Sequence, residues 1–296
     1  MAVAGAGRVK VYCEIMNSEL GILNSRWISL PALALLLGLA VPGAAQAQGR
    51  GRAAGAGPAP TARAAAPEDL TGYWVSVVTE HWHLRMLVPP KGEYAMLPLN
   101  PEARQVAGTW DPARDQASGN ECRSYGAAAI MRVPGRLHIH WADDNTLQVD
   151  IDSGTQTRLF RFRSAAPANQ APQAGAPNAA AAVGREWQGY SAAAWEGVAA
   201  RGRGAAAGGS GHLKVTTSRM RPGYLRKNGV PYSENAALEE HFDTFSEPNG
   251  DTWLVVTSIV TDPQYLTQPY VTTNHFKKIP ERSGWDPTPC RADQPR

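Results

Sequence analysis

The chain has 296 residues and a formal net charge of only +3, and its basic residues do not gather into one cluster. This balance argues against a dedicated nucleic-acid-binding protein, which would carry a concentrated basic face. The three cysteines are scattered without a Cys-x-x-Cys pair, which excludes the usual redox and structural zinc motifs.

Residues 1–47 have the layout of a secretory signal peptide. An apolar run at residues 28–41 follows Arg26 and precedes the small-residue site Ala45-Gln46-Ala47. A basic flank, a short apolar core and an Ala-x-Ala site are typical of such peptides, and the run is shorter than the about 20 residues of a membrane-spanning helix. We expect cleavage after Ala47, a periplasmic or secreted product, and no membrane span after cleavage. Translation starts at Met1 or, with a better layout, at Met16.

Removal of the signal peptide leaves Cys122 and Cys290 as the remaining thiols. Disulfides persist outside the reducing cytoplasm, and an even cysteine count favours pairing. The sequence therefore predicts a disulfide between these two residues.

Tracts rich in Gly, Ala and Pro divide the rest of the chain. Residues 48–67 have almost nothing to bury and read as a flexible arm, and the same composition at 164–182 and 198–211 indicates long surface loops. We expect one folded domain over residues 68–290 and a short tail at 291–296.

Short β-strands dominate the predicted domain. Runs of alternating or β-branched and aromatic residues, separated by turn signals, predict ten strands. They cover residues 71–79, 82–88, 137–141, 147–151, 155–162, 187–195, 212–220, 238–245, 252–261 and 269–278. One helix is expected at 101–110, with Asn100 as its N-cap and Pro101 at its first position. This pattern predicts an all-β, antiparallel barrel of about ten strands with one short helix.

Two resemblances support this architecture. The stretch Pro98-Leu99-Asn100-Pro101-Glu102, running on to Trp110 and Cys122, and the stretch 242–278 resemble an uncharacterised family of secreted bacterial β-rich proteins, which has no assigned activity. Gly72-Tyr73-Trp74 is similar to the Gly-x-Trp motif that opens a lipocalin barrel, which implies an inward-facing Trp74 at the closed end. Lys277 or Lys278 would replace the final-strand Arg that covers this Trp in lipocalins, and the Thr-Asp pair of that family is missing.

Histidine and aromatic residues are the candidate site residues. Trp74, Trp82 and Trp141 suit the lining of a pocket for a small, partly apolar molecule, although aromatic residues are also common in plain cores. His81 with His83, and His138 with His140, are spaced by two on predicted strands, so each pair shares a face and could ligate a metal. Such pairs also occur on ordinary solvated faces.

Known catalytic motifs are not recognisable in the chain. There is no Gly-x-Ser-x-Gly elbow, no phosphate-binding loop and no His-Glu-x-x-His, and Glu239 with His241 is the remaining acid–base candidate. The sequence thus favours an exported protein that binds a small molecule inside the barrel and needs no cofactor. The alternative is a metal-dependent enzyme on the same barrel, which uses the paired histidines.

Overall fold

The computed structural model describes residues 60–163, 184–197 and 211–296. The predicted signal peptide, most of the predicted arm and nearly all of both predicted loops lie outside these residues. In the described part, no helix is both long and apolar enough to cross a membrane.

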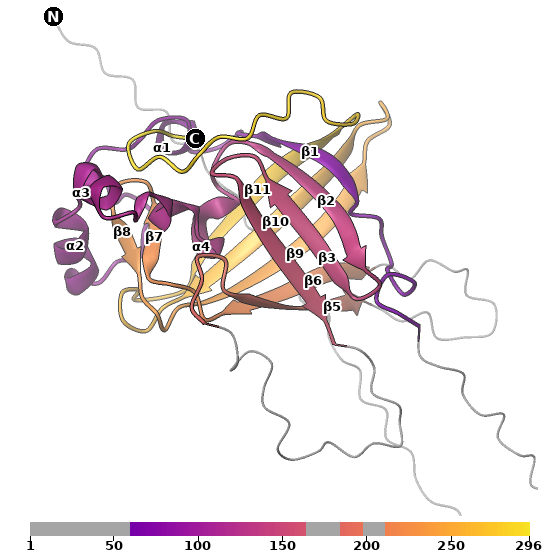
Figure 1. Ribbon diagram of the computed structural model, residues 1–296, viewed down its shortest axis with the longest axis horizontal. Coiled ribbons are helices and arrows are strands. Elements are labelled where there is room, and N and C mark those ends of the chain that lie inside the picture. The colour runs from indigo at the N-terminus through magenta and orange to yellow at the C-terminus, as the bar shows by residue number, and fades with distance from the viewer. Residues whose placement is uncertain (1–59, 164–183, 198–210) are drawn as a thin grey trace, which may run out of the picture. The chain divides into compact units, whose positions relative to one another are not determined.

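A closed barrel of nine strands forms the body of the domain (Figure 1). The order around the barrel is β1-β11-β10-β9-β6-β5-β4-β3-β2, and β1 pairs with β2 to close it. Every predicted strand except 82–88 overlaps one of these barrel strands. They are β1 (Gly72–Val77), β2 (Arg136–Asp143), β3 (Thr146–Ile151), β4 (Gln156–Phe162), β5 (Tyr190–Gly197), β6 (Gly211–Ser218), β9 (Ala237–Ser246), β10 (Thr252–Thr261) and β11 (Tyr270–Ile279).

The expectation of a wholly antiparallel barrel is wrong at one pair, because β4 and β5 run parallel. The reason is parity: strands that alternate in direction around a closed ring must be even in number, and this ring has nine. A parallel neighbour also needs a long crossover connection, and the chain between Phe162 and Tyr190 is long enough to provide one.

A cap of short elements covers one end of the barrel (Figure 1). It contains the helices α1 (Trp82–Arg85), α2 (Pro101–Gly108), α3 (Pro112–Ala117) and α4 (Ala127–Ile130), the 3₁₀ helix η1 (Glu121–Tyr125), and the hairpin β7 (Gly223–Arg226) with β8 (Val230–Tyr232). The predicted helix is confirmed as α2, where the Asn100 side chain accepts a hydrogen bond from the Ala103 amide at 2.8 Å. The expectation that it is the one helix of the domain is wrong, because α1, α3, α4 and η1 form as well.

The predicted strand at 82–88 is wrong, since this segment forms α1. Leu84 and Arg85 are both buried, and a strand would send such neighbours to opposite faces. Leu, Arg and Met have high helix propensity, and this preference outweighs the weak alternation of apolar and polar residues in the segment. His81 begins the turn in a left-handed conformation, so His81 and His83 do not lie on a strand.

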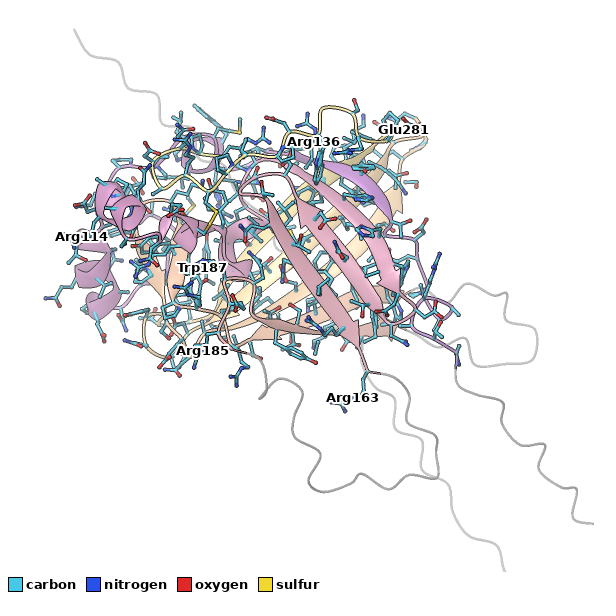
Figure 2. All side chains as sticks on the ribbon, in the orientation of Figure 1. Arg114, Arg136, Arg163, Arg185, Trp187 and Glu281 are labelled. Atoms are coloured by element: carbon cyan, nitrogen blue, oxygen red, sulfur yellow. A yellow bond between two sulfur atoms is a disulfide. The ribbon has the colours of Figure 1, made fainter. Side chains whose placement is uncertain are left out.

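Side chains from alternate positions fill the barrel (Figure 2). Trp74, Phe160, Phe242 and Phe276 are almost completely buried within one apolar cluster. The Trp74 indole donates to the Leu70 carbonyl at 3.0 Å, and the Lys278 ammonium lies 5.2 Å from the centre of its ring. A cation from the last strand therefore covers Trp74, while kinship to lipocalins stays a prediction.

Residues 60–70 cover the barrel end opposite the cap. The Trp195 indole donates to the Ala62 carbonyl at 2.8 Å, and the Ala62 amide donates to Asn145 at 3.0 Å. Leu70 is buried in the barrel cluster. Both ends of the barrel are thus covered by other parts of the chain.

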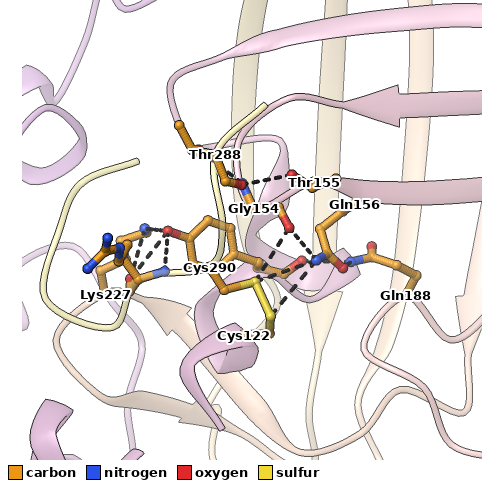
Figure 3. Close-up of a disulfide and its surroundings, with 10 residues drawn as sticks. Cys122, Gly154, Thr155, Gln156, Gln188, Lys227, Thr288 and Cys290 are labelled. Atoms are coloured by element: carbon orange, nitrogen blue, oxygen red, sulfur yellow. Dashed lines mark hydrogen bonds between the residues drawn. A yellow bond between two sulfur atoms is a disulfide. The ribbon is translucent and has the colours of Figure 1, made fainter. Parts of the chain in front are cut away.

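The predicted disulfide is confirmed: Cys122 in η1 is bonded to Cys290 near the C-terminus (Figure 3). Their Cα atoms lie 5.1 Å apart, within the usual range. The bond ties the C-terminal segment to the cap.

An ion pair is buried among the inward-facing polar side chains. Arg158 donates to both carboxylate oxygens of Glu240, at 3.0 and 2.6 Å, and to Thr217 Oγ1 at 3.3 Å. Both side chains of the pair are fully buried. A buried pair is costly to break because the remaining charge has no compensation.

We predict that Arg158→Met lowers the free energy of unfolding by about 3–5 kcal/mol, because Glu240 is left as an isolated buried charge. Adding Glu240→Met should restore part of that loss. Urea denaturation of both variants checks this, and a double variant less stable than Arg158→Met would contradict it.

Candidate functional site

The three predicted tryptophans do not line one pocket. Trp74 is buried in the barrel core, and Trp141 packs at its edge with ring centres 5.6 Å from Phe162. Trp82 is 61% exposed on α1, outside the barrel. The arrangement gives Trp74 and Trp141 packing roles and leaves Trp82 as a surface aromatic beside the cap.

The two histidine pairs are not brought together either. The metal-type groups found among the described residues contain His138 and His140 but neither His81 nor His83. The suggested partnership of Glu239 and His241 does exist, since His241 Nε2 lies 3.0 Å from Glu239 Oε1. It lies on the outer face of the barrel, where Lys214 Nζ also approaches Glu239 at 3.0 Å.

A pocket beneath α1 concentrates positive charge, and sequence reasoning missed it. We call it the cationic pocket, since its lining includes Arg85, Arg132, Arg226 and Lys227. Leu84, Leu87, Val133 and Leu225 give it apolar walls, and Ser124, Ala129 and Pro295 complete it. Its free volume is about 30 Å³, and among the described residues no Asp or Glu lines it.

Arg85 is the least satisfied of these cations. Only 4% of the residue is exposed, and its Nε donates to the Arg132 carbonyl at 3.0 Å. Its Nη1 and Nη2 atoms are buried without a hydrogen-bond partner among the described residues. Burial, reinforced by the charge of Arg132, lowers the pKa of Arg85 to about 10. Arg85 thus lines the pocket as a buried cation with two unpaired donors.

Arg226 and Lys227 are held in place by neutral oxygens. Arg226 donates to the carbonyls of Glu93 at 3.2 Å and Ala95 at 3.1 Å, while its Nε is buried without a partner. The Lys227 ammonium donates to the Tyr125 hydroxyl at 2.6 Å and to the Gln294 carbonyl at 2.8 Å. These contacts orient both cations without neutralising them.

None of the four cations takes part in an ion pair with any described residue. Glu80 and Asp293 act on Arg85 and Lys227 from a distance and outside the lining. Buried charges in proteins are normally paired, because an unpaired one costs several kcal/mol. The chemistry that would satisfy this pocket is that of a small anion.

Two larger hollows lack this imbalance. A cavity of about 200 Å³ is lined by Trp110, Tyr224, Tyr232 and other cap residues, and its ionised groups pair with each other: Arg123 contacts Asp115 at 3.0 Å. A hollow of about 560 Å³ at residues 92–98 is open to the surface. The cationic pocket is therefore distinguished from the two larger hollows by its unpaired positive charges and not by its volume.

Comparison of the chain with protein-family models, with curated proteins and with solved structures finds no match.

The pKa of Lys227 gives a test of its burial. Burial lowers this pKa from 10.5 to about 7, opposed by the charge of Asp293. Between pH 7 and 10.5 the unfolded chain then binds a proton that the folded chain has released, so the free energy of unfolding rises with pH.

We predict that this rise amounts to at most about 1.4 kcal/mol per pH unit and that Lys227→Met removes it. Urea denaturation between pH 6 and 9 measures both slopes, with Lys91→Met as an exposed control. Equal slopes in the wild type and Lys227→Met would contradict the assignment.

Proposed function

We propose that this chain is an exported protein that binds a small, partly apolar molecule through an anionic group held in the cationic pocket. The observation that carries the proposal is the pair of buried, unpartnered Nη atoms of Arg85. Export is inferred from the signal-peptide pattern, and the Cys122–Cys290 disulfide fits an oxidising compartment.

An oxyanion matches the donors available in the pocket. The planar guanidinium of arginine presents its terminal nitrogens as a fork, which binds carboxylate and phosphate oxygens in pairs. Arg85 offers two such donors and Arg226 offers its Nε, and Lys227 adds positive charge nearby below its lowered pKa of about 7. Each ligand oxygen would accept a hydrogen bond from a donor that otherwise has none. A hydrogen bond to a charged group is worth about 1.5–3 kcal/mol.

The apolar lining suggests the rest of the ligand. A free volume of about 30 Å³ holds the head group of a carboxylate or phosphate and little more. Leu84 and Leu87 line the same pocket, and Leu87, Met86 and Trp82 are exposed on or beside α1. An apolar body attached to the anion would cover this surface.

The proposed site lies in the cap, whereas the sequence led us to expect the ligand inside the barrel. The barrel interior is occupied by the protein's own side chains, and the pocket belongs to the cap. In this account the barrel serves as a rigid support, and irregular segments at its end carry the site, as loops on scaffolds often do.

We predict that octanoate binds the purified protein at least about tenfold more tightly than octan-1-ol, since the alcohol lacks the charge that Arg85 would pair. Arg85→Met should weaken octanoate binding at least about tenfold while leaving octanol binding unchanged. Isothermal titration calorimetry measures these affinities. Arg114→Gln is the matched control, because its side chain is 73% exposed on α3, at the outer edge of the cap (Figure 2).

The stability of the ligand-free variant separates a binding role from a structural one. If Arg85 serves the ligand, Arg85→Met should be at least as stable as the wild type, since it removes an uncompensated buried charge. A variant that is much less stable and binds octanoate as the wild type does would overturn the proposal. Equal affinity of the wild type for octanoate and octan-1-ol would also overturn it.

A further inference from the structure

A separate cluster of side chains lies on the outer face of β2 and β3. His138 and His140 alternate on β2, and Asp150 on β3 pairs in register with His138. Residues opposite one another in an antiparallel pair project to the same face, so the three side chains meet. One ligand atom from each lies within 4.8 Å of the other two.

The Asp150 carboxylate is oriented by its neighbours. Its Oδ1 accepts hydrogen bonds from Gln148 Nε2 at 2.8 Å and from Thr157 Oγ1 at 2.7 Å. Its Oδ2 lies 3.8 Å from His138 Nδ1 and 3.7 Å from His140 Nδ1, too far for a hydrogen bond to either. The free oxygen and the two nitrogens therefore surround a common point.

His140 supplies a second, independent observation. Its Nδ1 atom is buried from solvent and has no hydrogen-bond partner among the described residues. An imidazole nitrogen in this position normally bonds to water or protein, since an unmade bond costs about 1–3 kcal/mol. A ligand that accepts its lone pair would remove that cost.

Aromatic rings pack against one side of the cluster. Tyr73 stacks on His138 with ring centres 4.2 Å apart, and the edge of Trp285 approaches the same ring at 6.4 Å.

We propose that His138, His140 and Asp150 bind one divalent transition-metal ion of the zinc or copper class. Two imidazoles with a carboxylate suit these ions, which lie about 2.0–2.2 Å from each ligand atom. Two ligands of one tetrahedral ion are then roughly 3.4 Å apart. The two distances from the Asp150 oxygen to the imidazole nitrogens, 3.8 and 3.7 Å, exceed this by a few tenths of an ångström. The stacked histidine rings must tilt toward the common point, and the remaining coordination positions stay open to solvent.

The other histidine group offers a matched comparison. Glu196, His212 and His241 also lie close together, but His212 Nε2 and His241 Nδ1 contact each other at 3.1 Å. Lys214 Nζ lies 3.6 Å from Glu196, so a cation already occupies that neighbourhood. His212 Nε2, His241 Nδ1 and the Glu196 carboxylate already have partners within the protein, which leaves the first group as the site.

The test is calorimetric titration of Zn²⁺ and Cu²⁺ into purified protein that carries no polyhistidine tag and has been treated with a chelator. We expect one ion per chain, with affinity at least about tenfold weaker in His140→Ala and in Asp150→Asn. His212→Ala should bind as the wild type does. Circular dichroism confirms that each variant is folded.

The proposal is overturned if the wild type binds no ion, or if His212→Ala loses the ion while His140→Ala keeps it. Octanoate titration of the same variants is independent of this result, because the cationic pocket shares no residue with the cluster.

Discussion

Closure of the sheet by β1 is the constraint on which the rest of the structure depends. Tyr73 is paired both with Ile279 of β11 and with His138 of β2. This single short strand removes the two open edges that the other eight strands would leave, and open edges invite pairing with other chains. It also brings the first strand of the domain beside the last, which places Tyr73 and Trp285 around His138.

The closed barrel then leaves the segment between β1 and β2 free to fold over one end. That segment supplies Arg85 and Arg132, and the β7–β8 turn supplies Lys227 after Arg226. The Cys122–Cys290 disulfide draws the C-terminal residues onto the same cap, where the Gln294 carbonyl accepts from Lys227. Three parts of the chain thus meet at the cationic pocket, and the first two bring positive charges that form no ion pair with the described residues.

Much of the barrel could be predicted from the sequence, because half-buried strands alternate. The strand predicted at 252–261 has the observed bounds of β10, and the N-cap of α2 was recognisable at Asn100. The parallel pair of β4 and β5 could not be predicted, since local patterns do not reveal which strands become neighbours. The β7–β8 hairpin was missed, although Asn228-Gly229 is a common turn sequence.

The sites were less accessible to sequence reasoning. Asp150 could have been found, because the turn residues Asp143-Asp144-Asn145 lie between the predicted strands 137–141 and 147–151 and indicate a hairpin. The register of this hairpin sets Asp150 opposite His138. The cationic pocket had a weaker signal: arginines inside apolar runs, as in Leu84-Arg85-Met86-Leu87. Such a run does not reveal which charged side chains lie together in the fold. That no carboxylate of the described residues lines the pocket emerges only from the tertiary structure.

The central claim is that an oxyanion completes the cationic pocket, and diffraction tests it most directly. Crystals of the purified protein soaked in selenate would locate the anion by the anomalous scattering of selenium. The account predicts a selenium peak whose oxygens lie within hydrogen-bond distance of the Nη atoms of Arg85. Selenate bound elsewhere, with those atoms paired to a carboxylate of the protein, would contradict it.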